Sequence, residues 1–135
     1  MKGYTDLEQS KKLAEILPVE SADMHYSKDY DGSWFVDFYK YTSVKIPKYV
    51  GNVEEHLLPC WSLTALLDVL IAKDFDPETM FLRSTSDGRG TRLTNVWRLS
   101  VDRLDVDISL RDIYADSLVD ACVGMILRLN ELKML

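Results

Sequence analysis

The chain has 135 residues, of which 47% are hydrophobic and 28% charged, and carries a net charge of −6 at pH 7. This length fits a single domain over 1–135, and the composition excludes a disordered or fibrous chain. Because Asp and Glu outnumber Lys and Arg, the chain lacks a general electrostatic attraction to nucleic-acid phosphates and anionic lipids. We therefore expect neither direct nucleic-acid binding nor membrane binding.

A helix is predicted at the start of the chain. Thr5 and Glu8 have the spacing of a capping box, in which each residue bonds to the other's backbone N–H. Apolar residues then recur at helical spacing until Pro18, which cannot continue the pattern. The predicted helix therefore covers Asp6–Leu17.

A long strand is the next predicted element. Residues 21–31 are mixed in character and mostly polar, and the dipeptide Asp31-Gly32 at their end is typical of a turn. Residues then alternate in character between Ser33 and Ile46, which predicts a strand. One face of this strand carries Trp34, Val36 and Phe38, and the opposite face is less polar than a solvent-exposed face should be. Either other parts of the protein pack on that opposite face, or it forms a groove for a ligand or peptide. The candidate groove residues are Phe35, Tyr39 and Tyr41.

The middle of the chain predicts a buried helix followed by a hairpin. Residues 47–59 lack periodicity and are expected to form a long connection. Ser62 then caps a leucine-rich helix that runs to about Lys73. Residues 79–85 and 91–101 are expected to pair around the glycine-rich turn between them.

A break in the apolar pattern follows at Asp102-Arg103. Apolar residues occupy odd positions before it and even positions after it, so a tight turn or bulge is predicted there. Residues 104–110 then predict a strand whose polar side carries Asp105 and Asp107. Such paired aspartates can also hold a divalent cation, but alternation explains them without one. The sequence therefore predicts no metal and no cofactor.

The last predicted element is a helix over Leu118–Lys133. Ser117 and Asp120 resemble a capping pair at its start. Its apolar stripe is wider than one sheet contact needs, since additional apolar residues lie on an adjacent flank. This surplus allows a homodimer through the C-terminal helix. The flank residues are Leu118, Met125 and Leu132.

Acidic residues are concentrated in the segment 102–120. It contains six Asp and two Arg, with no Lys or Glu, for a local net charge of −4. This segment is either a solvated face beside a helix N-terminus or a surface that meets a basic partner. A third possibility is a mimic of nucleic acid that occupies a DNA-binding protein.

Cysteine and histidine residues are the remaining candidates for chemistry. Cys60 and Cys122 are too few for a disulfide framework, which favours a reducing compartment and predicts a cytoplasmic protein. No further ligands follow His25, His56 or Cys60 at zinc-like spacing. A hydrolase pair of Cys and His needs only proximity in space, so a small enzyme built around these residues stays an alternative.

Three segments resemble a family of uncharacterised small proteins from gut bacteria and their phages or mobile elements. They are EQSKKLAEILPVESADMHY, PCWSLTALLDVL and ADSLVDACVGMILRLNELKML. The last contains the Val119-Asp120-Ala121 triplet near the start of the final helix. The resemblance implies a bacterial or phage cytoplasmic setting, and it brings no activity, cofactor or catalytic residue.

Together, these patterns predict an α+β domain with about three helices on one side of a mainly antiparallel sheet of about four strands. The leading functional hypothesis is a non-enzymatic protein-interaction module of a phage or mobile element. Its partner would bind the aromatic strand or the acidic one. The alternatives are a small enzyme with an unrecognised Cys/His site and an acidic nucleic-acid mimic. The candidate binding residues are Phe35, Tyr39, Tyr41, Asp105 and Asp107.

Overall fold

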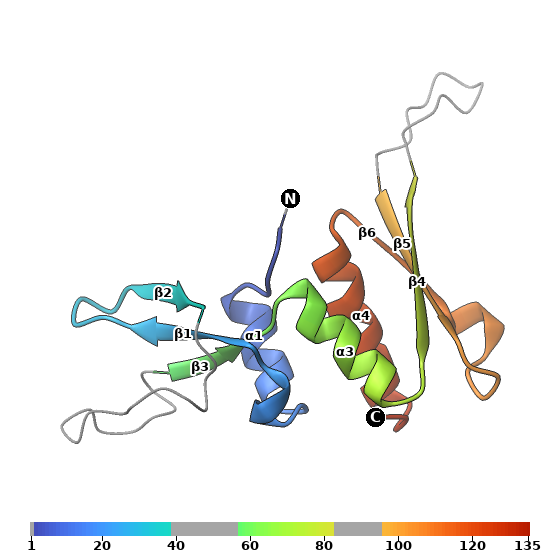
Figure 1. Ribbon diagram of the computed structural model, residues 1–135, viewed down its shortest axis with the longest axis horizontal. Coiled ribbons are helices and arrows are strands. Elements are labelled where there is room, and N and C mark those ends of the chain that lie inside the picture. Colours follow the sequence, from blue (N-terminus) through green and yellow to red (C-terminus); the bar gives the residue numbers. More distant parts are fainter. Residues whose placement is uncertain (1, 39–56, 83–95) are drawn as a thin grey trace. The chain divides into compact units, whose positions relative to one another are not determined.

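The computed structural model describes residues 2–38, 57–82 and 96–135, which form helices and antiparallel sheets (Figure 1). Two compact units divide the chain. The first is Gly3–Leu66, and the second is Leu67–Leu135 together with the two N-terminal residues. The α+β class is confirmed, and the strands within the described ranges are distributed over two three-stranded sheets. The single domain expected over 1–135 stays a prediction.

The described residues of the first unit include helix α1 and a three-stranded sheet of order β2-β1-β3, in which both pairs are antiparallel. Its elements are α1 (Leu7–Ala14), the short 3₁₀ helix η1 (Val19–Ser21), β1 (Met24–Lys28), β2 (Trp34–Asp37) and β3 (Leu57–Cys60).

Alternation along the central strand β1 gives this sheet one apolar face. Tyr26 is paired with Val36 on one side and with Leu58 on the other, and Met24 is paired with Cys60. Residues paired in this way project from the same face. They form a small core with the start of the chain, and the partly buried residues packed against it are Tyr4, Leu7, Trp34, Val36 and Leu58.

The second unit combines a sheet of order β4-β5-β6 with a long C-terminal helix. Its elements are β4 (Asp76–Leu82), β5 (Val96–Asp102), the 3₁₀ helix η3 (Ile108–Leu110), β6 (Asp112–Ala115) and α4 (Leu118–Glu131). The helix α3 (Leu63–Ala72) begins in the first unit and ends in the second.

Helix α4 covers one face of the second sheet, as Figure 1 shows. The contact is close, because a Cβ atom at Gly124 would lie 3.2 Å from Cδ1 of Ile113 on β6. Ile113 is paired with Leu99, which is completely buried, and Val101 on the same face is 2% exposed. The core of this unit therefore lies between α4 and the odd-numbered residues of β5.

Several sequence predictions are confirmed. The hydroxyl of Ser62 accepts a hydrogen bond from the N–H of Ala65 at the start of α3, and the hydroxyl of Ser117 accepts one from the N–H of Asp120 at the start of α4. Strands β4 and β5 form the expected antiparallel hairpin, with Leu82 paired to Val96. The glycine-rich turn predicted between them lies outside the described residues.

The capping box of the first helix was predicted one residue too early. Asp6, rather than Thr5, is the N-cap: its carboxylate accepts a hydrogen bond from the N–H of Gln9, whose side chain accepts one from the N–H of Asp6. The Thr5 hydroxyl is instead buried in the core, so it is not free to cap. The α-helix also ends at Ala14, before the predicted Leu17, and the N–H groups of Glu15 and Ile16 donate to carbonyls only three residues back.

Two strands lie where the sequence predicted none. β1 occupies part of the mixed, polar stretch 21–31, and β3 occupies the end of the predicted connection 47–59. The predicted turn at Asp31-Gly32 is present, with Gly32 at a φ of 84°. The long strand predicted from Ser33 is described only as β2, and its continuation lies outside the described residues.

The strand predicted over 104–110 is wrong. The chain turns after β5, where the N–H of Val106 donates to the carbonyl of Arg103, and η3 follows. Asp107 caps η3 by accepting from the N–H of Ser109. The turn expected at Asp102-Arg103 is therefore confirmed, while the alternation after it belongs to a capped turn.

The corrected capping box generates a testable difference between two acidic residues. Replacing Asp6 by Ala should lower the free energy of unfolding by about 1 kcal/mol, because the N–H of Gln9 loses its acceptor, whereas Asp6→Ser keeps one. Glu8→Ala should change it by less than about 0.5 kcal/mol, because Glu8 is exposed and its ion pair with Lys11 lies at the surface. Urea unfolding measures all three. A larger loss for Glu8→Ala than for Asp6→Ala would contradict the observed cap.

Candidate interaction surface

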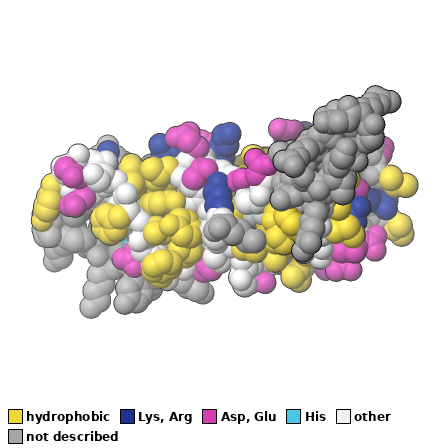
Figure 2. All heavy atoms as spheres, turned by 90° about the horizontal axis from the view of Figure 1, so that it is seen from above, with side chains coloured by type: hydrophobic (Ala, Val, Ile, Leu, Met, Phe, Trp, Pro, Cys, Tyr) yellow, Lys and Arg dark blue, Asp and Glu magenta, His cyan; other side chains and the backbone are white. Residues whose placement is uncertain are grey.

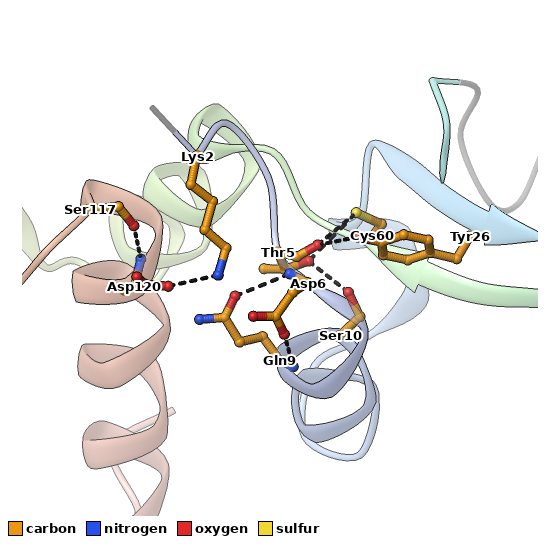
Figure 3. Close-up of polar contacts among 9 residues, drawn as sticks. All are labelled: Lys2, Thr5, Asp6, Gln9, Ser10, Tyr26, Cys60, Ser117 and Asp120. Carbon is orange, nitrogen blue, oxygen red and sulfur yellow. Dashed lines mark hydrogen bonds and ion pairs between the residues drawn. The ribbon is translucent and has the colours of Figure 1, made fainter. Parts of the chain in front are cut away.

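Cys60 belongs to a buried hydrogen-bonded cluster in the first unit (Figure 3). Its sulfur lies 3.6 Å from the Thr5 hydroxyl oxygen and 3.5 Å from the Thr5 carbonyl oxygen. The Thr5 hydroxyl also lies 2.7 Å from that of Ser10 and accepts from the N–H of Trp61, while the Tyr26 hydroxyl donates to the Thr5 carbonyl. These contacts tie the start of the chain to β1, β3 and α1, which is a structural role.

Neither cysteine is in an environment that activates a nucleophile. Burial raises the pKa of the Cys60 thiol, against smaller opposing effects of hydrogen bonds from Thr5 and Ser10. Burial raises the pKa of Cys122 to about 12. Reactive thiols require the opposite, a lowered pKa and some exposure.

The predicted Cys–His alternative does not assemble from the described residues. Met24 is paired with Cys60, and His25 is paired with Pro59. Because neighbouring residues of a strand project to opposite faces, His25 and Cys60 lie on opposite sides of the sheet. His25 is 2% exposed, and its Nε2 lies 3.7 Å from Oδ2 of Asp37. His56 lies outside the described residues.

The aromatic face predicted for the first strand is only partly described. Phe35 is half exposed and lies on the face of the first sheet opposite the core, in register with Ser27. Figure 2 shows hydrophobic side chains at the surface of the first unit. Tyr30, between β1 and β2, and Phe38, directly after β2, are exposed. Tyr39 and Tyr41 lie outside the described residues, so a groove with Phe35 stays a prediction.

Asp105 and Asp107 both serve the turn after β5. Oδ1 of Asp105 lies 2.8 Å from Nε of Arg103. Oδ1 of Asp107 accepts from the backbone N–H and the hydroxyl of Ser109, and these hydrogen bonds lower the pKa of Asp107. In the described parts of the chain, no three His, Cys, Asp or Glu side chains come together as metal ligands. This pair of aspartates is therefore explained by local structure.

The outer face of the second sheet has a different character. Leu99 and Val101 are buried on the α4 side, so alternation along β5 places Ser100 and Asp102 on the other side. On that side, the described residues of the second unit include no α-helix (Figure 1). The sheet thus exposes a polar face, as antiparallel sheets commonly do.

Carboxylates from all three strands meet on this outer face. Asp76 is paired with Asp102, while Ser100 is paired with Glu78 on β4 and with Asp112 on β6. We refer to Asp76, Glu78, Asp102 and Asp112 as the acidic sheet face. Like charges directly opposite each other, as in Asp76 and Asp102, destabilise a sheet.

A cavity of about 240 Å³ opens among these carboxylates. Arg111 is the cationic residue in its lining, and its Nε donates to the carbonyl of Val106. One guanidinium does not neutralise four carboxylates, so the cavity is complementary to a positively charged group. Asp120, in contrast, is already paired: its Oδ1 lies 2.8 Å from Nζ of Lys2 (Figure 3).

Apolar side chains adjoin the acidic sheet face further along the same strands. Arg98 is paired with Met80 on one side and with Tyr114 on the other. Met80 is 41% exposed and Tyr114 is 57% exposed. Nε of Arg98 is buried and has no hydrogen-bond partner within the described part of the chain. Buried donors of this kind are uncommon, and a bound acceptor is one explanation for them.

The sequence analysis missed Asp76 and Glu78 as site residues. Asp76 and Glu78 precede the strand predicted from residue 79, although Asp76, Glu78 and Met80 already have the spacing of one strand face. Asp102 and Asp112 were recognised as part of an acidic segment, but only strand pairing brings them next to Asp76 and Glu78.

The flank of the last helix that suggested a homodimer is largely buried within the chain. Leu118 is 8% exposed and Met125 is fully buried, whereas Leu132 is 41% exposed. The surplus apolar surface is therefore mostly used inside the chain. The homodimer itself stays a prediction.

Comparisons with protein-family models, curated proteins and solved structures give no match to this chain. The resemblance to small proteins of gut bacteria and their phages thus stays a prediction. Among the described residues, no helix has both the length and the apolar character needed to cross a bilayer.

The environment of the thiols generates a direct test of the enzyme alternative. In the native protein at pH 8, Cys60 and Cys122 should react with a thiol reagent such as DTNB only slowly, because both are buried and protonated, and rapidly after denaturation. A Thr64→Cys variant provides an exposed thiol as the control. A native Cys60 that reacts as fast as this control would revive a catalytic role.

Proposed function

We propose that this chain is a non-enzymatic protein-interaction module that binds a basic protein partner through the acidic sheet face. The proposal includes a phage or mobile-element origin and action in the bacterial cytoplasm, which the sequence resemblance and the two free cysteines support.

The observation that carries the proposal is the composition of the outer face of the second sheet. A merely solvated face needs neither the directly opposed Asp76 and Asp102 nor a buried Nε on Arg98 that has no hydrogen-bond partner among the described residues. Both features lower stability in the free chain. Cationic and hydrogen-bonding groups of a partner would compensate them, and exposed Met80 and Tyr114 would supply apolar contact area.

The nucleic-acid mimic is less well supported than a protein interaction. Mimicry requires about half a dozen or more carboxylates arrayed like duplex phosphates. Four carboxylates form the acidic sheet face, and Asp105, Asp107 and Asp120 are engaged in local contacts.

Site-specific cross-linking tests the proposed surface. The photoreactive residue p-benzoylphenylalanine in place of Tyr114, expressed in bacterial cells, should give a discrete cross-linked product with a basic protein. The same residue at Tyr30, which is fully exposed on the first unit, is the matched control and should not give that product.

Charge reversal then distinguishes specific binding at this surface from non-specific binding. Glu78→Lys should weaken the Tyr114 cross-link strongly, and high salt should weaken it as well, because the attraction is electrostatic. Glu15→Lys, an equal change of charge at an exposed position of the first unit, should leave it intact. A cross-link unaffected by Glu78→Lys, or identical products from both photoreactive positions, would contradict the proposal.

A further inference from the structure

Strand β4 is an edge strand with an open side. In the sheet order β4-β5-β6, it pairs only with β5 within the described residues. Each residue from Asp76 to Leu82 is exposed or half-buried. Exposed edge strands can accept a further strand from another chain, through main-chain hydrogen bonds.

The hydrogen-bond pattern of β5 shows which β4 groups face this open side. The N–H of Val101 donates to the carbonyl of Arg111, at 2.9 Å, so the main-chain groups of Val101 point toward β6 and away from β4. Pro77 is paired with Val101 and therefore forms a non-hydrogen-bonded pair with it. Because the pattern alternates, Pro77, Thr79 and Phe81 direct their main-chain groups to the open edge.

Pro77 agrees with this assignment. Proline has no N–H, and it is tolerated in strands where that group would face away from the sheet. The open edge then offers the N–H and carbonyl groups of Thr79 and Phe81 together with the carbonyl of Pro77. These residues lie where a docking strand can reach them.

The side chains of the alternate residues determine which strand fits. An added antiparallel strand would face Asp76, Glu78 and Met80 in non-hydrogen-bonded pairs, in which side chains approach most closely. Two of these three positions are acidic, and further carboxylates lie behind them in the cavity. Cationic side chains at two alternate positions, followed on the same face by an apolar one, complement this row.

We propose that β4 binds an extended segment of a basic protein as a fourth, antiparallel strand of the second sheet. In sequence order the segment has the pattern apolar-x-Lys/Arg-x-Lys/Arg, with the apolar residue opposite Met80. This inference rests on the proposed function and specifies its partner and binding mode. A second copy of the chain is a poorer occupant, because each copy carries a net charge of −6.

Titration of the ¹⁵N-labelled full chain with a synthetic peptide tests the inference. The peptide Thr-Leu-Thr-Lys-Thr-Lys-Thr should shift the N–H resonances of Thr79 and Phe81 and slow their exchange with solvent. The control peptide Thr-Leu-Lys-Thr-Lys-Thr-Thr has the same composition, but it places both lysines on the other face. It should bind roughly tenfold more weakly, because the two cross-strand charge pairs are lost.

A charge swap adds an internal control. Glu78→Lys should weaken binding of the first peptide several-fold, and a peptide with glutamate at the lysine that faces residue 78 should restore it. Glu15→Lys should have no effect. Equal binding of the two lysine peptides, shifts confined to residues away from β4, or no binding would overturn the inference.

The outcome also distinguishes strand addition from the broader proposal. If the peptide does not bind β4 but the Tyr114 cross-link persists and depends on Glu78, the acidic sheet face binds its partner in another way. If the free chain has the solution mass of a dimer and its Thr79 and Phe81 amides are protected without peptide, a second copy occupies the edge and strand addition by a basic segment is wrong.

Discussion

The strict alternation of β5 is the constraint on which the second unit depends. Leu99 and Val101 are buried on the α4 side, and this leaves Ser100 and Asp102 on the other side. A shift of the pairing by one residue would bury carboxylates against α4 and expose the leucine and valine, so the register is strongly specified. The buried core and the candidate surface therefore both follow from the alternation of β5, and a shift in register would alter both.

The same alternation gives neighbouring residues of β4 different hydrogen-bonding directions. Asp76, Glu78 and Met80 bond to β5 through their main chains and present side chains on the outer face. Pro77 and Thr79 instead direct main-chain groups to the open edge. Charge and proline at an edge are also devices that protect a sheet from indiscriminate pairing. Acidic side chains at this edge disfavour pairing with a neutral or acidic strand but favour pairing with a basic one. The same charges can therefore prevent indiscriminate pairing and allow selective binding.

Local sequence patterns were sufficient to predict elements that begin at a cap or turn formed by residues close together in the sequence. Ser62 and Ser117 mark the starts of α3 and α4 because a hydroxyl there bonds to an N–H three residues on. β1 was missed because it contains polar residues such as His25, which is 2% exposed and is paired with residues distant in the sequence. The segment with Asp105 was misassigned because alternation over a few residues also fits a capped turn. The acidic sheet face could not be predicted as a site, since it joins residues from three strands.

Residue-resolved hydrogen exchange of the free full-length chain tests this account most directly. The N–H groups of Glu78 and Met80 bond to β5 and should exchange slowly, whereas those of Thr79 and Phe81 face the open edge and should exchange rapidly. The account predicts this two-residue alternation along β4. Uniform protection along the strand would show that the edge is already covered, and slow exchange at Thr79 with rapid exchange at Glu78 would show that the register is wrong.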